Sequence, residues 1–255
     1  MWDAIVNGMM NILIWIYRLV GGNFGVAIIL FTILIRLVMY PIQAKQIKSS
    51  QAMQELQQNK KWKDTQEKYK GDKEKLAQEQ MKLYQELGIN PLASCLPMLL
   101  QLPIMFALYQ SITRAMASTP GQLVYLARGV YSIFGADNLV PLNSKFLWMN
   151  LGQPERVYAF GLAIPVLTIL VVITTFIQSK VTMPPASNAA PGDQSAAMGQ
   201  MMAYYMPLMM GWITYGLASG LAVYFILSNV LGVAQQAMMG KVYWDNLKPK
   251  KQVRK

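Results

Sequence analysis

The chain has 255 residues, of which 54% are hydrophobic and only 14% are charged, whereas soluble domains carry about a quarter charged residues. Histidine is absent and cysteine occurs once, which excludes zinc fingers, histidine-ligated metal sites, Ser-His-Asp or Cys-His nucleophiles and an intrachain disulfide framework. The 23 Lys and Arg residues exceed the 12 Asp and Glu residues, and the net charge of +11 suits nucleic acid or an anionic membrane surface. The composition predicts a membrane protein.

A transmembrane helix needs about 20 mainly apolar residues, and the chain contains five such stretches of 17 to 22 residues. We therefore predict an all-α polytopic membrane protein. In chain order the predicted elements are an outer interfacial helix at 1–21, a first span at 22–43, a cytoplasmic helical hairpin at 44–90, a second span at 91–112, an outer loop at 113–157, a third span at 158–178, a cytoplasmic disordered loop at 179–199, a fourth span at 200–216, a fifth span at 219–236 and a basic cytoplasmic tail at 237–255.

The first element carries polar residues at helical spacing. Asp3, Asn7 and Asn11 form a stripe that Arg18 continues, opposite apolar residues. This pattern predicts an amphipathic helix that lies in the outer membrane interface, because a secretory signal needs an unbroken apolar stretch. The alternative is an uncleaved extra span, which would reverse the topology.

The positive residues set the orientation. Ten lysines lie between residues 42 and 92, and six Lys or Arg residues lie after residue 236. Because cytoplasmic loops collect Lys and Arg, the hairpin and the tail are assigned to the cytoplasm. The N-terminus is then outside and the C-terminus is inside.

The hairpin region is rich in Lys, Glu and Gln of alternating sign, with Gly71 as its main helix breaker. This composition predicts an antiparallel helical hairpin with solvated outer faces. The hairpin is either a mobile arm that meets partners or guards an entry point, or a solvated connector, and periodicity leaves both open. The basic tail suits ribosomal RNA, anionic lipid or a simple topology anchor. No motif for sequence-specific nucleic-acid binding is found.

Arg36 is the one charged residue inside the predicted spans. It lies twelve residues after Phe24 and six before Ile42, or about 18 Å and 9 Å along a helix. A mid-helix arginine costs about 2.5 to 3.5 kcal/mol on insertion scales. Either its side chain snorkels to the cytoplasmic face, or it faces a water-filled recess that opens to the cytoplasm.

Other polar residues at similar depth favour the recess, although each alone is explained by a hydrogen bond between helices. The spans contain no Asp or Glu, so Arg36 lacks a counter-ion within them. The candidate groove residues are Arg36, Thr32, Gln101, Gln178, Ser228 and Asn229.

Methionines are concentrated in the second and fourth spans. Methionine repacks easily, which suits a surface that receives many apolar partners, although it is also an ordinary lipid-facing residue. The candidate residues of such a substrate slide are Met98, Met105, Met206, Met209 and Met210.

Four collinear segments carry a family resemblance and cover most of residues 24–236. They are GVAIILFTILIRLVMYPIQAKQ, KYKGDKEKLAQEQMKLYQELGINPLASCLPMLLQLPIMFALY, FLWMNLGQPE and YYMPLMMGWITYGLASGLAVYFILSNVLGVAQQ. The chain resembles the YidC-type membrane protein insertases, which have mitochondrial and chloroplast relatives. The resemblance implies five transmembrane helices around a hydrophilic groove that is closed outside and open to cytoplasm and lipid. It places Arg36 on the groove arginine, and Gln101 and Gln178 on groove-lining glutamines.

The resemblance also implies a function and a location. It implies a monomeric insertase of the bacterial cytoplasmic (inner) membrane, which moves short hydrophilic segments of nascent membrane proteins through the groove and releases their apolar helices into lipid. Anionic lipids are expected partners, and the ribosome and a Sec-type channel are left open. No cofactor and no enzymatic activity are expected. The alternative is a small channel or anion transporter that uses Arg36 as its anion site.

Overall fold

The computed structural model describes residues 1–69, 71–88, 96–116, 120–130, 142–159, 161–182, 194–239 and 242–247. The chain is mostly helical. The helices are α1 (Trp2–Leu19), α2 (Phe24–Gln58), α3 (Lys60–Lys68), α4 (Lys73–Glu86), α5 (Leu96–Met116), α6 (Pro120–Gly129), α7 (Val166–Thr182), α8 (Gln194–Gly216) and α9 (Ser219–Met238), followed by a short 3₁₀ helix, η4 (Trp244–Leu247). Of the predicted disordered loop at 179–199, the described residues 179–182 and 194–199 are helical parts of α7 and α8, so those bounds were too wide. Of the predicted tail at 237–255, the structure describes 237–239 and 242–247.

The prediction of an all-α chain needs one correction. Two antiparallel strand pairs lie between α6 and α7, namely β1 (Lys145–Phe146) with β2 (Met149–Asn150), and β3 (Val157–Ala159) with β4 (Leu162–Ile164). Gly161 has φ +77° in the turn between β3 and β4, a conformation that glycine adopts without steric cost. As a result, the predicted third span at 158–178 begins with a strand pair, and its helix begins only at Val166.

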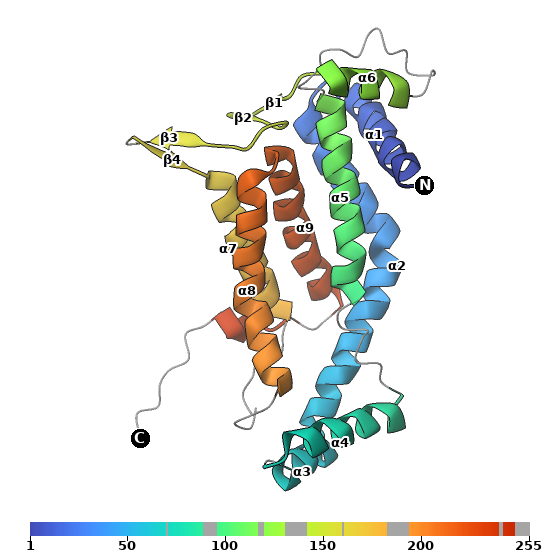
Figure 1. The fold of residues 1–255 in the computed structure, drawn as a ribbon, viewed down its shortest axis with the longest axis vertical. Helices are drawn as coiled ribbons and strands as arrows, with labels where there is room; N and C mark the ends of the chain where they lie inside the picture. The colour runs from blue at the N-terminus through green and yellow to red at the C-terminus, as the bar shows by residue number, and fades with distance from the viewer. Residues whose placement is uncertain are drawn as a thin grey trace.

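The helix α2 is the longest element and runs most of the length of the molecule (Figure 1). Two glycines with positive φ, Gly21 and Gly22, separate it from α1. The side chain of Asn23 caps its first turn by accepting a hydrogen bond from the backbone N–H of Val26 at 3.1 Å. The helix continues past residue 43, where the predicted span ends, to Gln58. Its 35 residues make a rod of about 52 Å.

The predicted hairpin is formed by α3 and α4, at the end of α2 opposite α1 and α6 (Figure 1). A single break at Gly71 was predicted, but the region has two breaks. Asn59 ends α2 and caps α3, and Asp72 caps α4. The ring of Trp62 is buried and packs against Tyr84, with ring centroids 5.3 Å apart. This aromatic contact holds the two arms together.

The polar stripe of α1 faces the protein. The buried Asn11 donates a hydrogen bond to the carbonyl of Gly129 at the end of α6, at 2.8 Å. Arg114 of α5 donates to Asp3 at 2.8 Å and to Asn7 at 3.2 Å. On the outer side of α1, Trp2, Ile5, Ile12 and Trp15 are exposed and suit lipid. On the docked side, Val6, Met10, Leu13 and Ile14 are fully buried, so α1 packs on the bundle through apolar residues as well as through its polar stripe.

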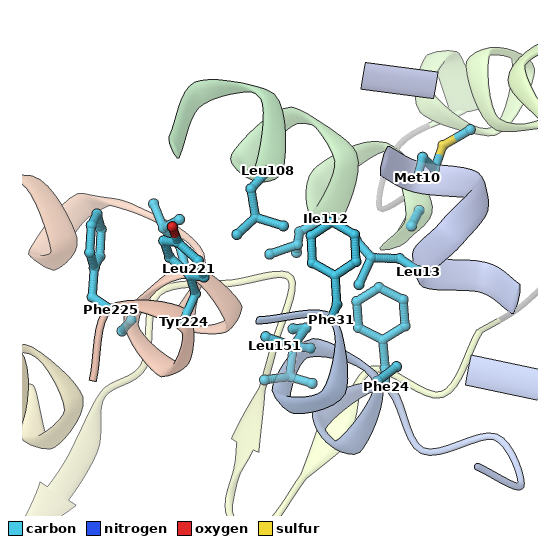
Figure 2. Packing of buried hydrophobic residues seen from close by; sticks show 14 of the residues in the cluster. Met10, Leu13, Phe24, Phe31, Leu108, Ile112, Leu151, Leu221, Tyr224 and Phe225 are labelled. Atoms are coloured by element: carbon cyan, nitrogen blue, oxygen red, sulfur yellow. The ribbon is translucent and has the colours of Figure 1, made fainter. Parts of the chain in front are cut away.

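The hydrophobic core lies among α1, α2, α5 and α9 at the α1 end of the bundle. Figure 2 shows Phe24 and Phe31 of α2 beside Ile112 of α5, with Leu221 of α9 in the same cluster. The segment after β2 closes this end, since the N–H groups of Ser219 and Gly220 donate to the carbonyls of Gln153 and Leu151 at 2.9 and 3.0 Å. The first turn of α9 is thereby capped by backbone.

The outer surface of the helices is strongly apolar. Trp212 is 80% exposed, and Leu37, Val38 and Leu208 are each more than 60% exposed. Large exposed apolar surfaces mark membrane or protein contacts. Within the described residues, two helices are long and apolar enough to span a membrane, Phe24–Ser49 and Ser219–Met238, and α7 is a shorter apolar helix.

Candidate functional site around Arg36

The guanidinium of Arg36 is held by neutral acceptors from two helices. Its Nη1 donates to Oε1 of Gln43 at 3.0 Å, and its Nη2 donates to the backbone carbonyl of Ser228 on α9. Gln43 lies seven residues further along α2, which is about 10 Å toward the hairpin. The side chain therefore runs toward the hairpin end of α2, as in snorkelling, and it ends on protein groups.

Gly232 makes room for the polar groups that meet on α9. A Cβ atom built on Gly232 would lie 2.6 Å from Nε2 of Gln178 and 3.5 Å from Nη2 of Arg36. Since real Cβ contacts of 2.6 Å are essentially never seen, any larger residue would have to displace the Gln178 amide. Arg36 of α2 and Gln178 of α7 thus meet over a glycine of α9.

One polar atom beside Arg36 has no partner. The hydroxyl oxygen of Ser228 is buried and makes no hydrogen bond to any residue that the structure describes. A buried hydroxyl without a partner is costly, so such a group is usually satisfied by water or a ligand. In the described part of the chain, Arg36 also forms no ion pair with a carboxylate. The site therefore consists of the Arg36 guanidinium, its neutral hydrogen-bond acceptors, and a Ser228 hydroxyl that makes no hydrogen bond to the described residues.

The other predicted groove residues form hydrogen bonds that do not include Arg36. Thr32 is fully buried, and its hydroxyl donates to the carbonyl of Ile28 within α2 at 2.7 Å. Gln101 of α5 donates to the hydroxyl of Tyr224 at 2.8 Å. Asn229 donates to the hydroxyls of Thr174 and Thr175 of α7, at 3.0 and 2.8 Å. Arg36, Gln178 and Ser228 are therefore brought together. Gln101 joins α5 to α9 and Asn229 joins α9 to α7, whereas Thr32 bonds only within its own helix.

The five methionines of the predicted slide do not share one exposed face. Met105 and Met210 are buried in the core, and Met206 is partly buried against it. Met209 is exposed. Met98 lies on α5, and its side chain is outside the described part. Two of the five are core residues because α5 and α8 turn those positions toward neighbouring helices.

Sequence reasoning missed Gln43 and Gly232. Gln43 was within reach, because residues seven apart lie on the same helix face. Gly232 was visible only as a glycine inside an apolar helix, which signals close approach of another group without identifying it. In the described residues, no group of three or more His, Cys, Asp or Glu side chains is placed to hold a metal ion.

The model of the family described as "60Kd inner membrane protein" matches residues 15–246. The chain belongs to this family. It is 36% identical to "Membrane protein insertase YidC 2" of Listeria innocua over 243 residues, covering 94% of this chain and 71% of the relative. It is 35% identical to "Membrane protein insertase YidC" of Oceanobacillus iheyensis, covering 89% of this chain and 80% of the relative. It is 33% identical to "Membrane protein insertase MisCA" of Bacillus subtilis, covering 92% and 77%.

These matches confirm the family predicted from the four collinear segments. They also confirm the predicted class, a membrane protein insertase of the YidC family and not an enzyme. Membership implies a polytopic bacterial membrane protein.

Proposed function

We propose that the chain inserts nascent membrane proteins into the bacterial cytoplasmic membrane by way of the polar site at Arg36. The proposed arrangement has five transmembrane helices around a cytoplasm-open groove, with the N-terminus outside and the C-terminus inside. A short hydrophilic segment of the substrate enters the groove from the cytoplasm. The apolar helix that follows it leaves sideways into lipid.

The observation that carries the proposal is the set of partners of Arg36. Its guanidinium has five N–H donors, and the described acceptors, the Gln43 amide oxygen and the Ser228 carbonyl, are both neutral. A carboxylate on a substrate tail would therefore gain a charge-assisted hydrogen bond. The unbonded Ser228 hydroxyl offers a second polar contact.

The driving force is differential solvation. A polar segment in hydrocarbon loses hydrogen bonds to water at a cost of several kcal/mol per unsatisfied group. Polar groups within the bundle lower this cost, and the apolar helix gains about 25 cal/mol for each Å² that it moves out of water. The same exposed apolar surface that suits lipid, with Trp212 and Leu208 on α8, borders the exit. Met209 is the predicted slide residue that this surface exposes.

Reconstitution into liposomes tests the proposal. The purified chain should integrate a single-span substrate with a short acidic tail, as measured by protection of the tail from added protease, and protein-free liposomes should not. Flux of small anions without integration would instead support the channel or transporter. Adding ribosomes or a Sec-type channel to the same assay tests those partners, and the insertion rate at rising protein density tests whether the monomer is sufficient.

A further inference from the structure

An apolar pocket lies between α7 and α8, on the outer surface of the bundle. It has a volume of about 340 Å³ and is lined by Val172, Ile173, Phe176, Tyr204, Pro207 and Leu208. This volume is at the lower end of the range for small-molecule sites. Ile173, Tyr204 and Leu208 are also exposed, so the pocket opens directly to the surroundings of the helices.

Two close approaches of the helices hold the pocket open between them. At one end, Gly211 of α8 admits Val172, whose methyl carbon would lie 2.4 Å from a Cβ at that glycine. At the other end, Pro207 lacks an N–H and leaves the carbonyl of Ala203 without its usual helical partner. The hydroxyl of Ser179 on α7 lies 3.4 Å from that carbonyl, and it shares its single hydrogen with the carbonyl of Phe176 at 3.0 Å. The pocket is therefore built into the fold and lies between two fixed contacts.

Lys180 is fixed at the end of the pocket next to Ser179. Nζ of Lys180 lies 4.3 Å from the centre of the Tyr204 ring and 5.5 Å from the centre of the Phe176 ring, and it donates to the Tyr204 hydroxyl at 3.0 Å. No ion pair with a carboxylate is seen for Lys180 among the residues described. Its positive charge is held by two aromatic rings and remains uncompensated.

The surroundings of Lys180 place it at the edge of the membrane. It lies in the last turn of α7, two residues beyond the predicted span. The helix η4 packs on this end of α7, where Asn246 donates to the carbonyl of Lys180 at 3.0 Å. The exposed Trp244 lies on the same short helix. Tryptophan and lysine at helix ends are typical of the headgroup level.

We propose that this pocket and Lys180 bind one anionic phospholipid of the cytoplasmic leaflet. The phosphate lies against the Lys180 ammonium, and one acyl chain lies along Phe176 and Leu208. A single cation at one end of a narrow apolar pocket matches one charged headgroup and one chain. The anionic lipids of that leaflet supply the complementary charge. The lipid site is separate from the site at Arg36, so this proposal goes beyond the proposed function. If the lipid site is disproved, the proposed function is unaffected.

Native mass spectrometry of the full-length chain in detergent tests the site, with phosphatidylglycerol and phosphatidylcholine added in parallel. The wild-type chain should retain phosphatidylglycerol in preference to phosphatidylcholine. Lys180→Gln should lower the affinity for phosphatidylglycerol by about fivefold, and Lys180→Arg should preserve it. Lys48→Gln removes an equal charge from an exposed position of α2 and should have no effect.

Leu208→Trp tests the apolar part of the site, because it fills the pocket. It should reduce retention of phosphatidylglycerol, and soluble glycerol phosphate should compete poorly with the lipid. Equal retention of both lipids, no change on Lys180→Gln, or full competition by glycerol phosphate would each overturn the proposal. A dimer that disappears in Leu208→Trp would also overturn it, since the occupant would then be a second copy of the chain. The thermal unfolding temperature of each variant shows whether it is folded.

Discussion

Replacing Arg36 with alanine should reduce insertion of substrates with acidic tails far more than insertion of neutral ones. The magnitude follows from the partners of the guanidinium. The guanidinium already donates a charge-assisted hydrogen bond to the neutral Gln43 amide, at 3.0 Å from Nη1. A substrate carboxylate in that place adds the attraction of an opposite charge, which at about 4 Å is about 1 kcal/mol in water and about 4 kcal/mol near a protein surface. For a partly solvated site we take a gain of about 1 to 2 kcal/mol. That difference corresponds to a factor of about 5 to 30.

The assay compares two single-span substrates in liposomes that contain the purified chain. The substrates are identical except that Asp and Glu residues in the tail are replaced by Asn and Gln. No membrane potential is applied, because a potential acts on charged tails independently of Arg36. The ratio of the two insertion rates should fall by about 5- to 30-fold in Arg36→Ala.

Two variants make the result specific. Arg36→Lys keeps the positive charge but not the planar group that reaches two acceptors, so it should keep part of the preference for acidic tails. Arg156→Ala removes a different exposed cation, which lies 5.5 Å from the ring centre of Tyr215, and should leave the ratio unchanged. An equal loss for acidic and neutral tails in Arg36→Ala would refute charge attraction and leave Arg36 only a role in hydration.

Three further substitutions have expected outcomes. Gly232→Ala should keep the fold but lower insertion, because the new Cβ would displace the flexible amide of Gln178; thermal unfolding and the liposome assay measure the two effects. Gly25→Ala should lower the stability by about 1 to 3 kcal/mol through overpacking, as measured by thermal unfolding, since its Cβ would lie 2.1 Å from the ring of Phe146. Asp72→Ala should weaken hydrogen-exchange protection in the first turn of α4, because that side chain caps the helix.

The substitutions at Gly25 and Asp72 each have a matched control. Gly8→Ala adds a methyl group where no atom lies within 4 Å, so it should not destabilise the chain. If it destabilised the chain as much as Gly25→Ala does, the steric argument would fail. Asp72→Asn keeps a capping oxygen and should keep the protection. The hydrogen bond from the backbone N–H of Lys75 lowers the pKa of the Asp72 carboxyl, so its stabilising effect is present at neutral pH and is lost as the pH falls below about 4.

Arg36 shows how far the sequence could define the site. A lone charge in an apolar helix identified the position, because only a functional or snorkelling role accounts for its cost. The sequence could not identify the carbonyl of Ser228 as a partner, since every residue has a carbonyl and only the packing of α2 against α9 selects one. The contact with Gln178 over Gly232 depends on the same packing. The spacing of residues within one helix does not show which distant helix packs against it.

The helix α1 shows the limit of amphipathic patterns. The stripe through Asp3, Asn7 and Asn11 predicted a helix with two faces, and two faces are present. A pattern gives the faces but not the medium that each one meets. In water the polar face would be outside, but here Arg114 and the carbonyl of Gly129 take up the polar groups. Apolar residues lie on both sides of the helix, since Met10 and Leu13 are buried in the core and Ile5 and Trp15 are exposed.

The methionines were the weakest part of the prediction for a related reason. In a soluble protein, an apolar residue on an amphipathic helix is predicted to face the core. In a membrane protein, both the core and the lipid-facing surface are apolar. Composition therefore does not separate Met210, which is buried, from Met209, which is exposed one residue earlier. Only the rotation of α8 about its axis does so, and α7 fixes that rotation by its close contact at Gly211.

The depth of the polar site relative to the core bears on what the insertase moves. Along α2, Phe24, Ile28 and Phe31 are packed in the core, and the polar contacts begin at Arg36. The distance from Arg36 back to Phe24 is about 18 Å along the helix, compared with about 30 Å for the hydrocarbon of a bilayer. Because the guanidinium reaches from residue 36 toward Gln43, the site on the proposed mechanism shortens the dry path by at most roughly 40% and leaves the remainder closed. Such a partial path favours short tails of few charges, because every additional polar group still has to cross the closed part without a partner.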